Sequence, residues 1–590
     1  MPSEALLKLR RYLHQYDIAA YIVPSSDPHQ SEYLPGHWKT REHISGFTGS
    51  AGTLVVTAKA AGLWTDSRYF LQAEQELQGT DITLQKMTPG KTGEYLDWLK
   101  AHLPTGSTIG LDGKLFSYMQ WQVIEKRLGE AGMEIDSNCD PVNHVWKDRP
   151  DLPRQPIFDF PESFAGQSRT EKLSIIRQQM QSDFLLLAAL DDIAWTFNLR
   201  GSDIDHNPVF LSYALIGRSE AWLFAAIEKM SPPLRNQLTE SGIQLQPYEA
   251  FDSFLGGLPD AATVSFDPQS TSIHLANHIP SEFQKREPAI PQKLKAQKNP
   301  IETAHLRRTM ALDGAALVRT MVWLEQQLVT GTADEKQIAD RLITERSKHP
   351  DYRDESFPAI VGYSANGAIV HYRPPDQAAA VIGRKSLLLI DSGGQYLSGT
   401  TDITRTFCPG KPTKSQRRDY TLVLKGHIAL AMTVFPKGTA GGQLDVLARQ
   451  HLWQEGLNYG HGTGHGVGFF LPVHEPPQNI SANLAGRATT PLQPGMLTSN
   501  EPGLYRPGQY GIRLENLILC VEKDQTEFGQ FLGFETLTLF PFEPALILRS
   551  LLTAVERRWL NTYHAEVLEK LRPYLNAAEL SWLEWRCAPI

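Results

Sequence analysis

The hydrophobic pattern at the start of the chain predicts a helix followed by β-strands. Ser3 is a suitable helix N-cap, and three leucines follow it at helical spacing: Leu6, Leu9 and Leu13. The apolar run 18–23 then predicts a strand, and the β-branched run 53–57 predicts another. This order of elements indicates an α/β module at the N-terminus.

A similar order of elements recurs later in the chain. Ser168 and Glu171 have the spacing of a capping box. The face of the helix that follows is marked by Leu173, Ile176 and Met180, and the apolar run 184–187 predicts a strand. We interpret this as a second α/β module of related design, joined to the first by the proline-rich stretch 148–161.

A third region begins after the lysine- and proline-rich stretch 288–300. It opens with a predicted helix whose apolar positions are Met310, Leu317, Met321 and Leu324. Short strand-like segments rich in glycine, histidine and acidic residues follow. Near the end, four residues recur at every fourth position and predict an amphipathic helix closed by Pro573: Val555, Trp559, Tyr563 and Val567.

Composition narrows the class of protein. The 590 residues suggest three or four domains at roughly 100–200 residues each. A net charge of −8 disfavours nucleic acid and anionic membranes as partners. No stretch reaches the ~18 apolar residues of a membrane span. The start lacks a signal-peptide pattern, and the four cysteines form no CxxC pair. We therefore expect a soluble cytoplasmic protein.

Two aspartates stand where a predicted hairpin would bring them together. Asp391 ends an apolar strand, and Asp402 precedes a β-branched run that predicts a returning strand. Two carboxylates in one pocket repel each other unless a cation or a proton lies between them. The alternative is that both are ordinary turn aspartates.

The segment 460–468 has glycine at every second position, with His461 and His465 between the glycines. Such a segment is a poor helix, so these are not a helical HxxxH zinc pair. Alternating glycine lets the backbone approach closely while both imidazoles point into one space. A plain glycine loop is the alternative.

Two glutamates complete the candidate set. Glu501 precedes a Pro-Gly turn, and Glu515 lies at the start of a predicted strand. Either one alone would more often be a surface residue. Together with the aspartates and a histidine, they form a set of mostly oxygen ligands. This set suits a pair of divalent ions such as Mn²⁺, with Co²⁺ or Zn²⁺ as alternatives.

The order and local context of these five residues resemble the metallopeptidases with the pita-bread catalytic fold. That family includes methionine aminopeptidase, prolidase, aminopeptidase P and the metal-free creatinase. The segments 366–372 and 473–476 resemble the aminopeptidase P and prolidase branch. Upstream segments, among them 46–52 and 64–70, look like the long, three-domain form of aminopeptidase P.

The resemblance implies an α/β (α+β) architecture of three domains and a homodimer. Residues 1–150 and 151–298 would be creatinase-like domains. Residues 299–590 would be a pita-bread catalytic domain with a C-terminal helical extension.

The resemblance also implies two divalent metal ions per chain, with Mn²⁺ as the first expectation. Their implied ligands are Asp391, Asp402, His465, Glu501 and Glu515. A water or hydroxide held between the ions would be the nucleophile, because two cations favour its deprotonated form. Glu501 would act as general base.

Four further residues would surround the substrate. The resemblance assigns His371, His461 and His474 to substrate positioning and oxyanion stabilisation, and Arg513 to orienting neighbouring carboxylates. Asp27 and His29 leave two alternatives open. They could reach the partner subunit's cleft or only cap the end of a strand.

The implied activity is hydrolysis of the N-terminal Xaa-Pro bond of peptides. A prolidase, which cleaves Xaa-Pro dipeptides, is the nearest alternative, and a pita-bread domain that only binds peptides is a second. The intact ligand set disfavours the second, because binding-only relatives lose ligands. The expected partners are peptides with proline in second position, without nucleic acid or membrane.

Overall fold

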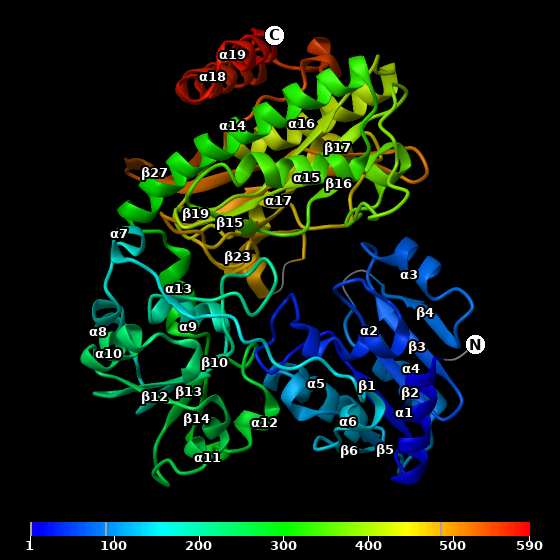
Figure 1. The fold of residues 1–590 in the computed structure, drawn as a ribbon, viewed down its shortest axis with the longest axis vertical. Helices are drawn as coiled ribbons and strands as arrows, with labels where there is room; N and C mark the ends of the chain where they lie inside the picture. The colour runs from blue at the N-terminus through cyan, green and yellow to red at the C-terminus, as the bar shows by residue number, and fades with distance from the viewer. Residues whose placement is uncertain (1–2, 89–90, 484–485) are drawn as a thin grey trace. The chain divides into compact units, whose positions relative to one another are not determined.

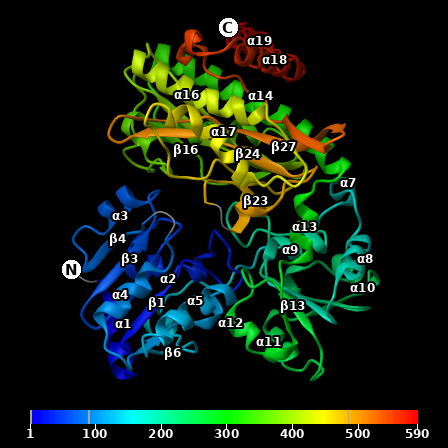
Figure 2. The same cartoon turned by 180° about the vertical axis from the view of Figure 1, so that it is seen from behind.

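The computed structural model describes residues 3–88, 91–483 and 486–590. The chain forms two compact units, the first made of residues 1–162 with 167–292 and the second of 163–166 with 293–590 (Figures 1 and 2). Both N-terminal modules lie in the first unit. The division into three domains with the expected boundaries therefore stays a prediction.

The first module begins with helix α1 (Glu4–Gln15), as the sequence predicts. Ser3 caps it by accepting the N–H of Leu6, and the three predicted leucines are buried. The predicted strand 18–23 starts only at Ala20, because Ile18 N–H still bonds to Leu13 O in the turn after the helix. The sheet runs in the order β4 (Ile82–Lys86), β3 (Ala61–Thr65), β2 (Thr53–Thr57), β1 (Ala20–Val23), β5 (Thr108–Gly110) and β6 (Glu134–Asp136).

The second module repeats this topology. Helix α8 (Arg169–Gln179) begins with the predicted Ser168–Glu171 capping box and ends one residue before Met180, which is its C-cap. Its sheet runs in the order β12 (Ile243–Gln246), β11 (Ala221–Ala225), β10 (Ser212–Gly217), β8 (Phe184–Leu187), β13 (Val264–Phe266) and β14 (Gln284–Arg286). Parallel and antiparallel pairs fall at the same positions in both sheets. The two modules therefore share one design.

The second unit packs long helices against several sheets, one of them six-stranded. Helices α14 (Pro300–Thr330) and α16 (Lys414–Ala431) lie along the same side of its strands (Figures 1 and 2). Two of its sheets carry or border the predicted metal ligands. The first has three strands, in the order β16 (Ile360–Tyr363), β17 (Leu388–Ser392) and β20 (Ile403–Phe407). The second has six strands, in the order β21 (Val434–Pro436), β28 (Gly529–Thr536), β27 (Asn516–Thr526), β24 (Leu497–Asn500), β22 (Gly464–Gly466) and β23 (Glu475–Ile480).

The C-terminal helix also agrees with its predicted pattern. Helix α18 (Ala554–Leu571) ends just before Arg572 and Pro573, and α19 (Ala577–Arg586) follows. Both pack against α14. Among the helices of the described residues, none combines the length and the apolar character needed to span a membrane.

Candidate active site

Asp391 and Asp402 lie on neighbouring strands, as the hairpin interpretation predicts. β17 pairs antiparallel with β20, so Asp391 stands opposite Thr404, and Asp402 immediately precedes β20. The residues between them form their own short strand pair, β18 (Gly394–Tyr396) and β19 (Gly399–Thr400). The chain thus places two carboxylates at the same end of one sheet.

The glycine-rich segment forms strand β22, between β23 and β24. A Cβ at Gly464 would lie 1.9 Å from Ser499 O, and one at Gly466 would lie 2.2 Å from Glu475 O. No side chain fits at either position. The alternating glycines therefore allow β23 and β24 to pack closely against β22, and His465 lies between the two glycines.

His465 faces two of the carboxylates. Its Nδ1 lies 3.0 Å from Gly466 O, to which it can donate, and this contact favours the tautomer with a free Nε2. Nε2 lies 3.5 Å from Asp402 Oδ2 and 3.5 Å from Glu501 Oε1. The free nitrogen is thereby presented as a possible metal ligand.

The glutamates are held by the ends of adjacent strands. Glu501 follows β24, donates its N–H to Thr463 O and accepts a 3.2 Å hydrogen bond from Ser499 Oγ. Glu515 lies between β26 (Tyr510–Arg513) and β27, and its carboxylate accepts a 2.8 Å hydrogen bond from Thr404 Oγ1.

The cluster has the chemistry of a cation site. Ligand atoms of Asp402, His465 and Glu515 all lie within 4.8 Å of one another. Asp391 Oδ1 and Asp402 Oδ1 are buried and accept no hydrogen bond from the described residues. Unsatisfied buried anionic oxygens are costly unless a cation or a proton meets them. The residues present therefore fit a divalent metal.

The carboxyl pKa values lead to the same conclusion. Burial, and next the neighbouring carboxylates, raise the pKa of Asp402 and of Glu515 well above their ordinary values. Burial also raises the pKa of Glu501, although His465 and Arg513 oppose it. Without positive charge among them, these groups favour their protonated forms.

Three of the four predicted substrate residues are linked by hydrogen bonds or ring contacts to this cluster. The ring of His474 lies 4.3 Å from that of His465, measured between centroids. His461 Nε2 lies 2.8 Å from the hydroxyl of Tyr505, which accepts a 2.7 Å hydrogen bond from Arg513.

The fourth, His371, lies in a segment that Arg513 also reaches. The guanidinium donates to Val370 O at 3.4 Å and to Asp391 Oδ2 at 2.5 Å. Among the hydrogen bonds of the described residues, Arg513 thus donates to Asp391 and not to Glu515, the carboxylate nearer to it in sequence.

Sequence reasoning did not single out Tyr505, Thr404 or Ser499. Tyr505 follows Glu501 in the same short segment, but neither a periodicity nor a spacing marks it as a partner of His461. Thr404 and Ser499 look like ordinary strand residues. Their roles depend on which strands become neighbours.

Asp27 and His29 lie in the first unit and are buried there. Asp27 accepts the N–H groups of His29 and Ser31, and so closes the turn that follows β1. The His29 ring lies 2.9 Å from Ala188 O and 2.8 Å from the Tyr248 hydroxyl, so it joins the two N-terminal modules.

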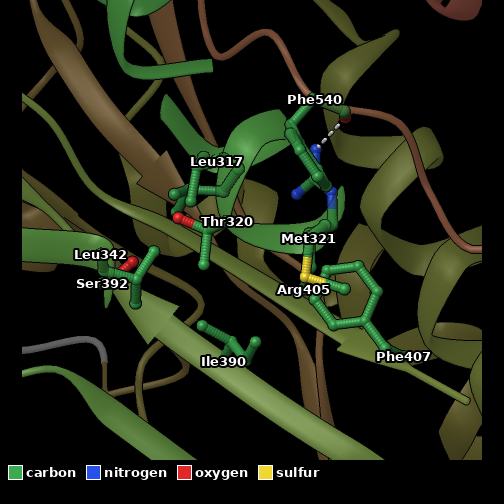
Figure 3. A pocket seen from close by; sticks show the side chains of 10 residues that line it. Leu317, Thr320, Met321, Leu342, Ile390, Ser392, Arg405, Phe407 and Phe540 are labelled. Carbon is green, nitrogen blue, oxygen red and sulfur yellow. Dashed lines mark hydrogen bonds between the residues drawn. The ribbon is translucent and has the colours of Figure 1, made fainter. Parts of the chain in front are cut away.

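A small cavity lies behind the strand that bears Asp391 (Figure 3). Ile390 and Ser392 line it, and they point to the face of β17 opposite Asp391 because side chains alternate along a strand. Leu317, Thr320 and Met321 of α14 line it from the other side. Its volume of about 10 Å³ holds one water at most, so it is not a substrate site.

Comparison with known families covers nearly the whole chain. Residues 304–522 match metallopeptidase family M24, and residues 530–590 match the C-terminal region of that peptidase family. Residues 6–142 and 148–302 each match the creatinase/prolidase N-terminal domain. These matches confirm the predicted fold class.

Individual relatives are similar over their full length. A probable Xaa-Pro aminopeptidase P of Laccaria bicolor is 40% identical, and the match covers 100% of this chain and 94% of that protein. Xaa-Pro aminopeptidase 1 of Dictyostelium discoideum is 38% identical, with 100% and 96% covered.

The crystal structure of an X-prolyl aminopeptidase from Caenorhabditis elegans, described as a cytosolic enzyme with a di-nuclear active site, superposes with a TM-score of 0.95. It is 35% identical, and the match covers 100% of this chain and 99% of that one. On the strength of its ligand cluster, its domain matches and these full-length relatives, the chain belongs to the Xaa-Pro aminopeptidases of metallopeptidase family M24.

Proposed function

We propose that this protein removes the first residue from peptides whose second residue is proline, with two divalent cations in its active site. The observation that carries the proposal is the convergence of Asp402, His465 and Glu515 within 4.8 Å in a buried cluster. The di-nuclear site of the nematode relative supports the number of cations. Mn²⁺ is our first choice, because most of the ligands are carboxylate oxygens.

The proposed ligands are those of the cluster: Asp391, Asp402, His465, Glu501 and Glu515. When bound, two such cations supply Lewis acidity and lower the pKa of water to near neutrality. Ligand atoms of Asp402 and Glu515 lie within 4.8 Å of one another, so these two carboxylates would help to hold the cations. Arg513 orients Asp391 through its 2.5 Å hydrogen bond.

Glu501 is the proposed general base. It lies beside His465, its carboxylate accepts a hydrogen bond from Ser499, and its backbone N–H donates to Thr463 O, so both its side chain and its backbone are held next to the cluster. From there it can accept a proton during attack and pass it to the leaving proline nitrogen.

His371, His461 and His474 are the proposed substrate-side residues. His474 stands next to His465, and His461 is oriented by Tyr505, which Arg513 in turn orients. Imidazoles can donate to a developing oxyanion and line a pocket for the pyrrolidine ring. Both ring nitrogens of His461 have partners here, Gly462 O at 2.7 Å and the Tyr505 hydroxyl at 2.8 Å, so His461 would have to release one of them to reach an oxyanion. The Xaa-Pro bond has no N–H, so a site that does not require one is suited to it.

Three further points belong to the same proposal. The protein acts in the cytoplasm, in line with the nematode relative described as cytosolic. It works as a homodimer. Its chain consists of two creatinase-like domains, 1–150 and 151–298, and a catalytic domain, 299–590.

A peptide series tests the proposal. With Mn²⁺ added, Ala-Pro-Ala should be cleaved to alanine and Pro-Ala. Ala-Ala-Ala should have a kcat/KM roughly 10–200-fold lower, because it lacks the ring that fills the pocket. Equal rates on both tripeptides would remove the proline assignment. Faster cleavage of the dipeptide Ala-Pro than of Ala-Pro-Ala would favour the prolidase alternative.

A further inference from the structure

A buried carboxylate outside the ligand cluster organises the segment that carries His371. Glu335 is the first residue of helix α15 (Glu335–Arg346), and it is fully buried. It accepts five hydrogen bonds from four groups: Tyr363 N–H (2.7 Å), Asn366 Nδ2 (2.9 and 3.2 Å), the Tyr372 hydroxyl (2.7 Å) and Ala380 N–H (3.1 Å).

These donors are spread over one continuous stretch, residues 363–380. Ala380 is held twice, because its carbonyl also accepts the backbone N–H of Glu335. The stretch leaves β16 at Tyr363 and passes through the 3₁₀ turn η6 (Ser364–Ala368) before it reaches His371. One side chain therefore fixes the beginning, the middle and the end of this stretch.

His371 has an anchored residue on each side. Its predecessor Val370 gives its carbonyl to Arg513, and its successor Tyr372 gives its hydroxyl to Glu335. Asn366 Nδ2 also donates to the Tyr372 hydroxyl at 3.0 Å, which closes a triangle of polar contacts. The backbone of His371 is thus held from two directions.

Capping the helix does not explain this arrangement. Asp334 is the N-cap of α15 and forms a complete capping box with Gln337. The charge of Glu335 lies near the positive end of the helix, but a solvated glutamate would satisfy that preference equally well. Burial with all donors taken from one stretch points to a more specific role.

We propose that Glu335 is a positioning residue for the substrate-side histidine His371. The proposal rests on the proposed function, in which His371 contacts the substrate. Glu335→Gln keeps the shape of the side chain but replaces an acceptor oxygen with an NH₂ group that opposes the existing donors. A misplaced imidazole should lower kcat/KM on Ala-Pro-Ala roughly 10- to 100-fold.

Two readouts distinguish positioning from general stability. Amide hydrogen exchange should become faster in residues 363–380 of Glu335→Gln and stay unchanged in α16. In a His371→Ala background, adding Glu335→Gln should cause no further loss of kcat/KM, because the group that it positions is absent. Tyr372→Phe removes a single donor and should give a smaller loss that also disappears in that background.

Glu345→Gln is the matched control. Glu345 is likewise buried on α15, but its ion pairs are with Arg341 and Lys348. It should leave kcat/KM and the exchange of 363–380 unchanged. An equal loss from Glu335→Gln with and without His371, or unchanged exchange in 363–380, would overturn the positioning role. No cleavage of Ala-Pro-Ala by the unmodified protein would instead overturn the proposed function itself.

Discussion

Arg513 Nη2 lies 2.5 Å from Asp391 Oδ2, although 122 residues separate them in the sequence. Both side chains are nearly inaccessible to solvent. The same guanidinium donates to the Tyr505 hydroxyl, whose other partner is His461. The buried guanidinium of Arg513 therefore joins Asp391, a proposed metal ligand, to His461 on the proposed substrate side of the site.

Replacing Arg513 should weaken metal binding more than folding. Arg513→Lys keeps a positive charge but loses the planar fork that reaches Asp391 and Tyr505 together. Because partners of a ligand tune its affinity, we expect the Mn²⁺ dissociation constant to rise roughly 10–100-fold. Titration calorimetry with Mn²⁺ measures this.

Arg506→Lys serves as the control for Arg513→Lys. Arg506 belongs to the same hairpin, but its guanidinium binds Asp419. It should keep the Mn²⁺ affinity of the unmodified protein. An unchanged affinity in Arg513→Lys as well would show that this contact does not support the metal site.

Glu501→Gln should nearly abolish turnover while the protein stays folded. The change preserves the side-chain shape but removes a ligand charge and the proposed base. General base catalysis contributes about 10²–10⁴-fold, so kcat should fall by at least that range. Steady-state kinetics and circular dichroism check the two halves of the prediction. A kcat above about a tenth of the original would exclude the base role.

The metal-free protein should become less stable as pH rises. Burial holds the folded-state pKa of Asp402 and Glu515 above their ordinary values of 3.8 and 4.5. Above those values the folded chain therefore binds more protons than the unfolded chain, and the free energy of unfolding falls with increasing pH. Added Mn²⁺ should reverse this trend, because cation binding replaces the protons.

Thermal unfolding of the chelated protein between about pH 4 and pH 7 measures this dependence. The Tm should fall across that interval without metal, and the gap to the Mn²⁺-loaded protein should widen. A gap that stays constant over the same interval would contradict the raised pKa values of these two carboxyls.

Two glycines of the His461–His465 segment should respond differently to alanine. A Cβ at Gly464 would meet Ser499 O at 1.9 Å, whereas the nearest atom to a Cβ at Gly462 is 3.5 Å away. Overpacking of this kind costs about 1–3 kcal/mol or more, so Gly464→Ala should be strongly destabilised. Gly462→Ala should lie within about 1 kcal/mol of the unmodified protein.

The denaturant midpoints of the two glycine variants measure this difference in stability. Equal midpoints for Gly462→Ala and Gly464→Ala would mean that β22 and β24 can separate without cost. That result would show that close strand packing is not the reason for the alternating glycines.

Local signals were sufficient for much of the fold. The Ser3 cap, the Ser168 capping box and the amphipathic C-terminal helix all appear where the pattern predicts them. Each depends on residues within a few positions of one another, so the sequence carries the information directly. The strand that starts at Ala20 and not at residue 18 shows the limit, because the preceding turn captures Ile18.

The composition of the candidate site was also readable from the chain. Asp391, Asp402, His465, Glu501 and Glu515 stand in segments whose residue types suit a cation, and the structure brings three of them within ligand distance of one another. Which of them bind metal, and how the histidines act, remain predictions.

What the sequence determined by itself was therefore the type of the elements with strong local patterns, such as α1, α8 and α18, and the resemblance to the family of the chain. The related design of the two N-terminal modules was a prediction, and the matching strand orders of the two sheets confirm it. Only the tertiary structure decided that Arg513 contacts Asp391, that Tyr505 contacts His461 and that Glu335 holds the stretch around His371. These contacts join residues 37, 44 and 122 positions apart. They form because packing buries polar groups that must then find partners, and sequence spacing does not encode which partners they find.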